Sequence, residues 1–294
     1  MLDLQELAEL FEAHKADAQQ PIKSFEIGGE PFDFDQQAAV MGVVNLSPGS
    51  WYRESVCLSP ESAIQRGFVL FAQGAHIIDV GAESTLADAE RVPAQSQIEQ
   101  LDPIVTELSK AGVPVSVETY EPSVAETMLE RGAEFINLTG TEHADAIYDA
   151  VAAHDAGVII CHIAGANVRE VHELNLSENP ISAVFDYFEK QIESATSSGV
   201  ERIFVDPGLG FYYPNLQDGQ IRVRHQIQTF LNSFRLRKLG FPICHALPHA
   251  FEYFKDEVRS AEPFFAVLAA LGKTNLFRTH EVSRVRAILD VLQA

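Results

Sequence analysis

From residue 40 onward, short apolar runs alternate with longer segments in which apolar residues recur at helical spacing. Each run has four to seven residues and is rich in valine and isoleucine, which is typical of parallel strands buried on both faces. There are eight runs, at 40–46, 76–80, 114–118, 134–138, 157–162, 202–206, 242–246 and 275–278. Eight strand–helix units in about 250 residues predict an α/β fold, a single (β/α)8 TIM barrel.

The segments between the runs carry the start and stop signals of helices. Ser59 followed by Pro60 is a cap residue before proline at the first helical position. We expect helices at 60–74, 94–110, 122–131, 144–154, 181–198, 219–238, 261–272 and 281–293. Glycines that favour a left-handed helix end follow several of them: Gly74, Gly112, Gly132, Gly157, Gly199 and Gly240. A doubly wound sheet is the alternative, but no Gly-x-Gly-x-x-Gly follows the first run.

Residues 1–39 lack this repeat, and we expect them to form an extension to a barrel at 40–294. Leu4, Leu7, Leu10 and Phe11 have helical spacing, and a polar link at 16–20 follows. The segment 24–32 places Gly-Gly between two apolar stretches, which predicts a hairpin that plugs the bottom of the barrel.

The charge and the hydropathy pattern limit the partners of the chain. The 294 residues carry a formal charge of −21, and the sequence pI is about 4.8. A polyanion is repelled at long range, so we expect no nucleic-acid partner. No apolar run reaches the ~18 residues of a membrane span, and the first residues do not resemble a signal peptide. We expect no membrane partner, a cytoplasmic location, and no disulfide between Cys57, Cys161 and Cys244, which show no recognisable spacing.

Polar side chains close nearly every predicted strand. In a barrel of this type the active site lies at the C-terminal ends of the strands. The residues found there are Asn45, Asp79 with Glu83, Glu118, Asn137, His162, Asp206, His245 with His249, and Arg278 with His280. Any one of them could hold a loop in place, but together they predict a polar mouth.

Two groups of these residues suggest particular ligands. Asp206 can accept two parallel hydrogen bonds from an amidine-like ring edge, with Asn137 and Glu118 beside it. Asp-Pro-Gly is also a common turn, so a structural role for Asp206 stays open. Arg278, His280 and Asn45 form a donor cluster suited to phosphate or pyrophosphate. The alternative is that Arg278 pairs with Glu83 or Asp79 across the mouth.

A metal-dependent hydrolase is a further alternative. His162, His245, His249 and His280 could converge on one rim, and imidazoles are common zinc ligands. The His-x-His typical of such barrels after the first strand is absent, however, because Asn45 stands there.

Six segments, one per expected strand end and in the right order, resemble the dihydropteroate synthase family. Asp-Pro-Gly-Leu-Gly-Phe at 206–211 matches the family motif intact. Met-Gly-Val-Val-Asn-Leu-Ser-Pro at 41–48 is similar to its opening, and Arg-Thr-His-Glu-Val at 278–282 to its close. The other three segments are at 78–85, 114–120 and 132–137. The resemblance covers most of residues 40–293.

The resemblance implies a pterin-binding barrel that joins 6-hydroxymethyl-7,8-dihydropterin pyrophosphate to p-aminobenzoate in folate biosynthesis. It implies that Asn45, Arg278 and His280 are the catalytic residues that hold the pyrophosphate, with Mg2+ as a cofactor near Asn45. The implied substrate-binding residues are Glu118, Asn137, Asp206, Phe211, Thr85 and His249. It also implies a homodimer through the late helices, where Phe264, Phe265, Val267 and Leu268 cluster, although core packing would explain that cluster equally well.

Several positions differ from the family pattern. Glu118 and Leu138 each stand where the family has Asp, and Gly49 and Trp51 stand where it has Asp and Phe. Leu86-Ala87 stands where the family has Arg-Pro, and Pro248-His249-Ala250 where it has Ser-Arg-Lys. Each lost charged hydrogen bond typically costs about 1.5–3 kcal/mol, so His249 or Tyr212 would have to compensate. The alternatives are a relative with another acceptor, a folate-dependent methyltransferase, or a non-catalytic pterin-binding partner. Retained Arg278 and His280 argue against the methyltransferase.

Overall fold

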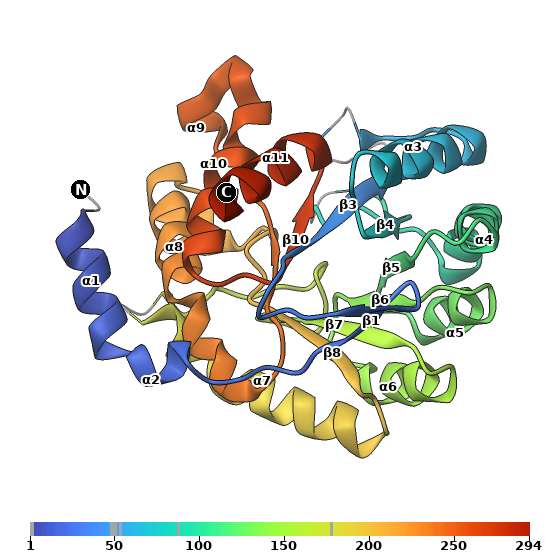
Figure 1. Ribbon diagram of the computed structural model, residues 1–294. Coiled ribbons are helices and arrows are strands. Elements are labelled where there is room, and N and C mark those ends of the chain that lie inside the picture. The colour runs from blue at the N-terminus through green and yellow to red at the C-terminus, as the bar shows by residue number, and fades with distance from the viewer. Residues whose placement is uncertain (1–2, 48–51, 53–54, 87–88, 177–178) are drawn as a thin grey trace.

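Eight parallel strands form a nearly closed barrel surrounded by helices in the computed structural model, which describes residues 3–47, 52, 55–86, 89–176 and 179–294 (Figure 1). Their order around the barrel is β8-β7-β6-β5-β4-β3-β10-β9, and a parallel bridge from Val205 to Ile243 joins β8 to the segment before β9. The strands are β3 (Ala39–Asn45), β4 (Ile77–Gly81), β5 (Val115–Thr119), β6 (Phe135–Leu138), β7 (Gly157–Cys161), β8 (Arg202–Asp206), β9 (Cys244–Ala246) and β10 (Leu276–Thr279). The predicted TIM barrel is confirmed.

The helices that follow the strands form the outer layer. They are α3 (Pro60–Ala72), α4 (Ala94–Lys110), α5 (Pro122–Glu130), α6 (Ala144–Ala153), α7 (Pro180–Ser197), α8 (Gly219–Asn232), α10 (Ala261–Leu271) and α11 (Val282–Gln293). The side chain of Ser59 accepts from the backbone of Ser62 at the start of α3, and that of Asp218 caps α8 in the same way. These caps fix where the helices begin beneath the rim.

The core has two layers because side chains alternate across each strand. Phe135 on β6 points into the barrel with Met41, Ile77 and Phe204, whereas Ile136 packs against the surrounding helices. The parallel register pairs Glu118 of β5 with Asn137 of β6, so polar residues that end neighbouring strands reach the same rim.

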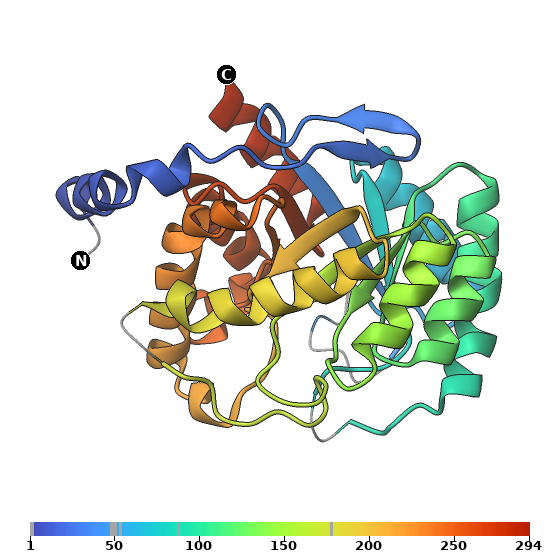
Figure 2. The ribbon, with the colours of Figure 1, turned by 90° about the horizontal axis from the view of Figure 1, so that it is seen from below.

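The N-terminal extension covers the other end of the barrel. The hairpin of β1 (Phe25–Ile27) and β2 (Glu30–Phe32) lies across the barrel end opposite the loops that follow the strands (Figures 1 and 2). The rings of Phe25 and Phe34 meet Phe204 edge-on, at centroid distances of 5.1 and 5.2 Å. The predicted hairpin is present, and its aromatic side chains complete the barrel interior from below. The division of the chain at residue 39 stays a prediction.

Helix α1 (Leu4–Ala13) projects beside α8 and buries none of its residues fully (Figure 1). The expected polar link at 16–20 is wrong in part, because residues 15–18 form the short helix α2 (Lys15–Ala18). Asp17 pairs with Lys238 at 3.1 Å, and Ala18 is buried, so contacts with a distant segment stabilise this turn.

Two further local predictions need correction. Gly157 is not a helix end: it is the first residue of β7, and Asp155, with φ of 51°, takes the left-handed position after α6. The helix expected at 219–238 is divided into α8 and a 3-10 helix, η3 (Ser233–Leu239). Three short helices, η2 (Pro214–Leu216), α9 (Phe251–Phe254) and η4 (Lys255–Ser260), lie in segments that were expected to be loops. In the described part of the chain, no helix combines the length and apolar character needed to cross a membrane.

Candidate active site

A cavity that is open to solvent lies at the C-terminal ends of the strands. The structure brings every catalytic and substrate-binding residue that the resemblance implies to its wall, from segments spread over more than two hundred residues. These residues are Asn45, Thr85, Glu118, Asn137, Asp206, Phe211, His249, Arg278 and His280. Their proximity follows from the parallel strands, which all end at this rim; their individual roles stay predictions.

Arg278 joins two of the acidic residues across the mouth. Its Nε donates to Asp79 at 2.7 Å and its Nη2 donates to Glu118 at 2.5 Å. Asp79 is fully buried and also accepts from Asn137 at 3.2 Å and Ser116 at 2.7 Å. The pairing of Arg278 with Asp79, which the sequence left open, is therefore present. The guanidinium lies on the carboxylate side of the mouth.

Asp206 ends β8 at the base of the cavity. Its carboxylate accepts the backbone N–H of Gly208 at 2.8 Å, within the Asp-Pro-Gly turn. Gly208 has φ of 78°, and a Cβ there would lie 2.3 Å from the carbonyl oxygen of His162, so only glycine fits this turn. Burial raises the pKa of Asp206 to about 6, although Gly208 and Arg278 act in the opposite direction.

Glu118 is the second strongly perturbed acid of the mouth. Burial raises its pKa to about 7, Arg278 opposes this, and the negative charges of Asp79, Glu83 and Asp206 add to it. A buried acid that titrates near neutrality beside other carboxylates is typical of a binding or catalytic site. The site therefore favours a ligand that supplies N–H donors or positive charge.

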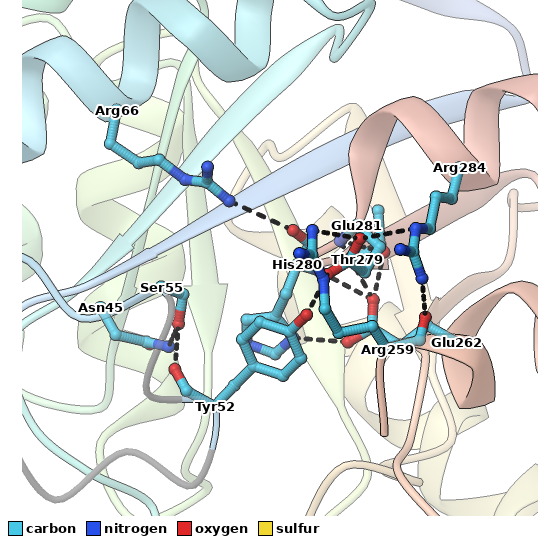
Figure 3. Close-up of polar contacts among 10 residues, drawn as sticks. All are labelled: Asn45, Tyr52, Ser55, Arg66, Arg259, Glu262, Thr279, His280, Glu281 and Arg284. Atoms are coloured by element: carbon cyan, nitrogen blue, oxygen red, sulfur yellow. Dashed lines mark hydrogen bonds and ion pairs between the residues drawn. The ribbon is translucent and has the colours of Figure 1, made fainter. Parts of the chain in front are cut away.

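Asn45 and His280 lie on the other side, in a continuous polar network (Figure 3). Asn45 donates from Nδ2 to Ser55 at 2.7 Å, and Ser55 donates to the backbone carbonyl of Tyr52 at 2.8 Å. The Tyr52 ring stacks on the imidazole of His280 at 4.5 Å, with an angle of 11° between the planes. His280 Nδ1 bonds to Glu262 at 2.6 Å. The two predicted anion-binding residues are thus linked through the loop after β3.

The remaining wall combines aromatic and polar groups around His249. The hydroxyl of Tyr212 is 3.0 Å from Nε2 of His249. Burial lowers the pKa of His249 to about 4, which keeps the imidazole neutral at pH 7. Arg222 of α8 donates to Glu252 at 2.7 and 2.8 Å, while its buried Nε has no partner among the described residues. Buried Gln226 Oε1 is likewise unpaired in this part of the chain. This wall offers donors and acceptors near the position of the family's Ser-Arg-Lys segment.

The four histidines do not converge, so the expectation of a shared rim is wrong. His245 is fully buried and bonds to Ser233 at 2.6 Å, and His162 packs edge-on against Tyr187 outside the cavity. Across the described ranges, no group of three or more His, Cys, Asp or Glu is placed to hold a metal ion. The departures at Gly49, Trp51 and Ala87 lie outside the described residues.

Tyr52, Arg222 and Glu262 are among the residues of the site and its surroundings that sequence reasoning missed. None of them ends a strand. Tyr52 lies in the loop after β3, Arg222 is in the first turn of α8, and Glu262 is in the first turn of α10. For Arg222 and Glu262, the available signal in the sequence was a charged residue in a helix directly beneath the rim.

The family profile described as "Pterin binding enzyme" matches residues 41–247, which places the barrel among the pterin-binding enzymes. The chain is 31% identical to the dihydropteroate synthase of Synechocystis sp. over 91% of this chain and 93% of that protein. It is 29% identical to the dihydropteroate synthase of Bacillus subtilis, over 89% of this chain and 90% of that protein. The chain therefore belongs to the dihydropteroate synthase family.

A solved structure supports the same assignment. The dihydropteroate synthase of Xanthomonas albilineans with 4-aminobenzoic acid superposes with a TM-score of 0.74. The match covers 94% of this chain and 98% of that one, at 25% identity.

Proposed function

We propose that this chain is a transferase of folate biosynthesis that condenses 6-hydroxymethyl-7,8-dihydropterin pyrophosphate with p-aminobenzoate. The observation that carries the proposal is the convergence of Asp206, Asn137 and Glu118 on one cavity that Asn45 and His280 also line. A flat ring with an amidine edge fits the first group, and an anionic leaving group fits the second.

The carboxylates have a role in the chemistry beyond binding. When the C–O bond to the diphosphate breaks, its electron pair leaves with pyrophosphate and a cationic methylene forms on the pterin. Asp79, Glu118 and Asp206 share the positive charge of Arg278, so the mouth is locally rich in negative charge. Fixed charges of this sign stabilise a developing cation. The arylamine nitrogen then bonds to the methylene and releases a proton.

Arg222 supports an acceptor that carries a carboxylate. Its guanidinium lines the cavity beside Tyr212 and His249, and its ion pair is with Glu252, whose side chain is 44% exposed. A half-exposed partner is only a weak competitor for a ligand carboxylate. We assign p-aminobenzoate to this wall, with Phe211 and Thr85 as further contacts. The structure of the Xanthomonas albilineans relative contains 4-aminobenzoic acid.

A magnesium ion fits the site as a companion of the diphosphate. Asn45 Nδ2 donates to Ser55, so its amide oxygen is the atom with the chemistry of a magnesium ligand. Mg2+ usually takes one or two protein groups together with phosphate oxygens and water, so the lack of a larger acidic cluster among the described residues is compatible with it. When bound, it would neutralise charge on the diphosphate.

The proposed setting is a cytoplasmic homodimer. Cys57, Cys161 and Cys244 are free thiols, as expected in a reducing compartment. Ile221, Tyr253 and Phe264 expose 49, 55 and 45% of their surface around one groove between α8, α9 and α10. Only part of the predicted cluster is exposed, because Phe265 and Leu268 are buried and belong to the core. A second copy seated on this groove would cover the exposed members.

The proposal is tested by incubating the protein with the pterin pyrophosphate and p-aminobenzoate and measuring dihydropteroate. Asp206→Asn should weaken pterin binding by calorimetry at least tenfold, because it removes a charged acceptor worth about 1.5–3 kcal/mol. Asp149→Asn on α6, which only loses a surface contact with Ser198, is the matched control. Unchanged affinity in Asp206→Asn would refute the assigned pose. Pterin binding without product would favour another acceptor or a non-catalytic partner.

A further inference from the structure

Glu262 is a buried carboxylate placed directly behind the predicted catalytic histidine. It lies in the first turn of α10, and only 1% of its surface is exposed. Its Oε1 is 2.6 Å from Nδ1 of His280 (Figure 3). A carboxylate in this environment is costly unless several donors satisfy it.

Three further donors fix the orientation of this carboxylate. Oε2 accepts the backbone N–H of His280 at 2.9 Å and that of Glu281 at 3.3 Å, and the hydroxyl of Thr279 also donates to it. All three come from the strand end that carries His280. Oε1 is therefore the oxygen that meets the imidazole, and it can only accept when the group is ionised.

The imidazole itself cannot turn easily. Tyr52 covers one face of the ring, and its hydroxyl donates to Glu281, which Arg259 holds at 2.6 and 3.0 Å. Arg66 donates to the backbone carbonyl of His280 at 3.3 Å. Nδ1 is engaged by Glu262, and Nε2 is the second ring nitrogen of this side chain, which lines the cavity.

We infer that Glu262 is a positioning residue that keeps a hydrogen on Nδ1 of His280, so that the imidazole binds the diphosphate through Nε2–H as a cation. The second hydrogen is taken up from solvent together with the anion. Diphosphate as the ligand rests on the proposed function; the hydrogen on Nδ1 does not. Carboxylates that orient a functional imidazole through its second nitrogen act in this way in other enzymes.

The variant Glu262→Gln makes a sharp prediction. The three donors at Oε2 demand the amide oxygen there, which places the amide NH2 opposite Nδ1. Nδ1 must then become an acceptor, and the hydrogen moves to Nε2. The imidazole keeps one donor toward the cavity but loses its positive charge. Pyrophosphate should therefore bind about tenfold or more weakly, while pterin affinity stays unchanged.

Nitrogen-15 NMR of the imidazole ring shows directly which ring nitrogen carries the hydrogen. The His280 signals are assigned by their absence in His280→Gln. In the wild type, Nδ1 should resonate as a protonated nitrogen with and without pyrophosphate; in Glu262→Gln it should resonate as an unprotonated one. Glu134→Gln is the matched control, since that glutamate binds Arg202 and Gly28 at the opposite barrel end. Its His280 signals should match the wild type.

An unprotonated Nδ1 in the wild type would overturn the inference, whether or not the variant folds. An unshifted Nδ1 in folded Glu262→Gln would do the same. Failure of the wild type to bind pyrophosphate by calorimetry would instead reject the diphosphate site of the proposed function, and would leave the role of Glu262 in placing the hydrogen to be decided by the NMR alone.

Discussion

At the scale of single residues, three carboxylates of the mouth, those of Asp79, Glu118 and Asp206, lie close to the guanidinium of Arg278. Asp79 and Glu118 bond to Arg278, and Asp206 lies near enough to be affected by its charge. Raising the pKa of Asp206 from its usual 3.8 to about 6 corresponds to roughly 3 kcal/mol of disfavoured ionisation. A ligand that donates hydrogen bonds to this carboxylate relieves that penalty, which favours pterin binding.

Pterin affinity should therefore depend on pH in a defined direction. The ligand edge needs the ionised form of Asp206, and protons compete for it below the pKa of about 6. Affinity measured by calorimetry should fall at least tenfold from pH 7 to pH 5, because Asp206 alone accounts for that factor and protonation of Glu118, whose pKa is about 7, acts in the same direction. In Asp206→Asn the profile should keep only the part of the fall that comes from Glu118. A wild-type affinity that is flat between pH 5 and pH 7 would contradict the assignment.

Arg222 should act on the acceptor and not on the pterin. Replacing it by Gln removes a charged partner of the p-aminobenzoate carboxylate, so the KM for p-aminobenzoate should rise about tenfold or more. The Kd for the pterin pyrophosphate should stay the same. Arg224→Gln changes an exposed residue two positions along the same helix, outside the cavity wall, and serves as the control. An equal loss of pterin affinity in Arg222→Gln would show that the residue only supports the fold.

The spacing of the sequence predicted site residues at the ends of strands, and the family resemblance added Thr85, Phe211 and His249 in the loops that follow. Asp206, Asn137 and Arg278 could be placed on one rim because parallel strands bring their carboxyl ends together. Glu262 could not be found in this way, because its partner His280 is eighteen positions away and the contact depends on how α10 packs against β10. The pairing of Arg278 with two carboxylates also depends on side-chain geometry that no spacing encodes.

At the scale of elements, most ends of the eight strands and of the main helices could be predicted to within one or two residues. Continuous apolar runs and capping signals are local, so they survive tertiary packing. The short helices could not be predicted in this way. Helix α2 forms because Ala18 is buried and Asp17 pairs with Lys238. Segments whose conformation comes from distant contacts are those that sequence reasoning left as loops or links.

The N-terminal hairpin should stabilise the barrel without shaping the active site. Phe34 is buried and packs on Phe25, Phe32 and Phe204, with ring centroids 4.8 to 5.2 Å apart. Phe34→Ala should lower the free energy of unfolding in urea by about 3–5 kcal/mol. Phe11→Ala, on exposed α1, should change it by less than about 0.5 kcal/mol.

Pterin affinity under conditions where Phe34→Ala is folded should match the wild type. The hairpin lies at the barrel end opposite the loops that follow the strands (Figure 2), whereas residues at the C-terminal ends of the strands line the cavity. A loss of affinity in the folded variant would mean that the barrel end and the rim are coupled. Equal stability of Phe34→Ala and the wild type would contradict the role of the hairpin as part of the core.

At the scale of the whole molecule, barrel closure places a ring of carboxylates at one end and leaves an apolar groove on the side. The same closure that assembles the site also sets α8 and α10 next to each other, so Ile221 and Phe264 share that groove. Exposed aromatic and aliphatic side chains gathered in one patch on a highly charged protein are typical of an interface. The groove shares no lining residue with the cavity.

The proposed homodimer should consequently be sensitive both to this groove and to salt. Phe264→Glu places a charge in the apolar contact and should convert a dimer to a monomer in light scattering coupled to gel filtration. Phe68→Glu, at a similar exposure on α3, should leave the mass unchanged. Each copy brings a charge of −21, so dissociation should increase at low ionic strength, where repulsion is least screened. A wild-type monomer at all salt concentrations would reject the dimer, and a dimer that persists in Phe264→Glu would place the interface elsewhere.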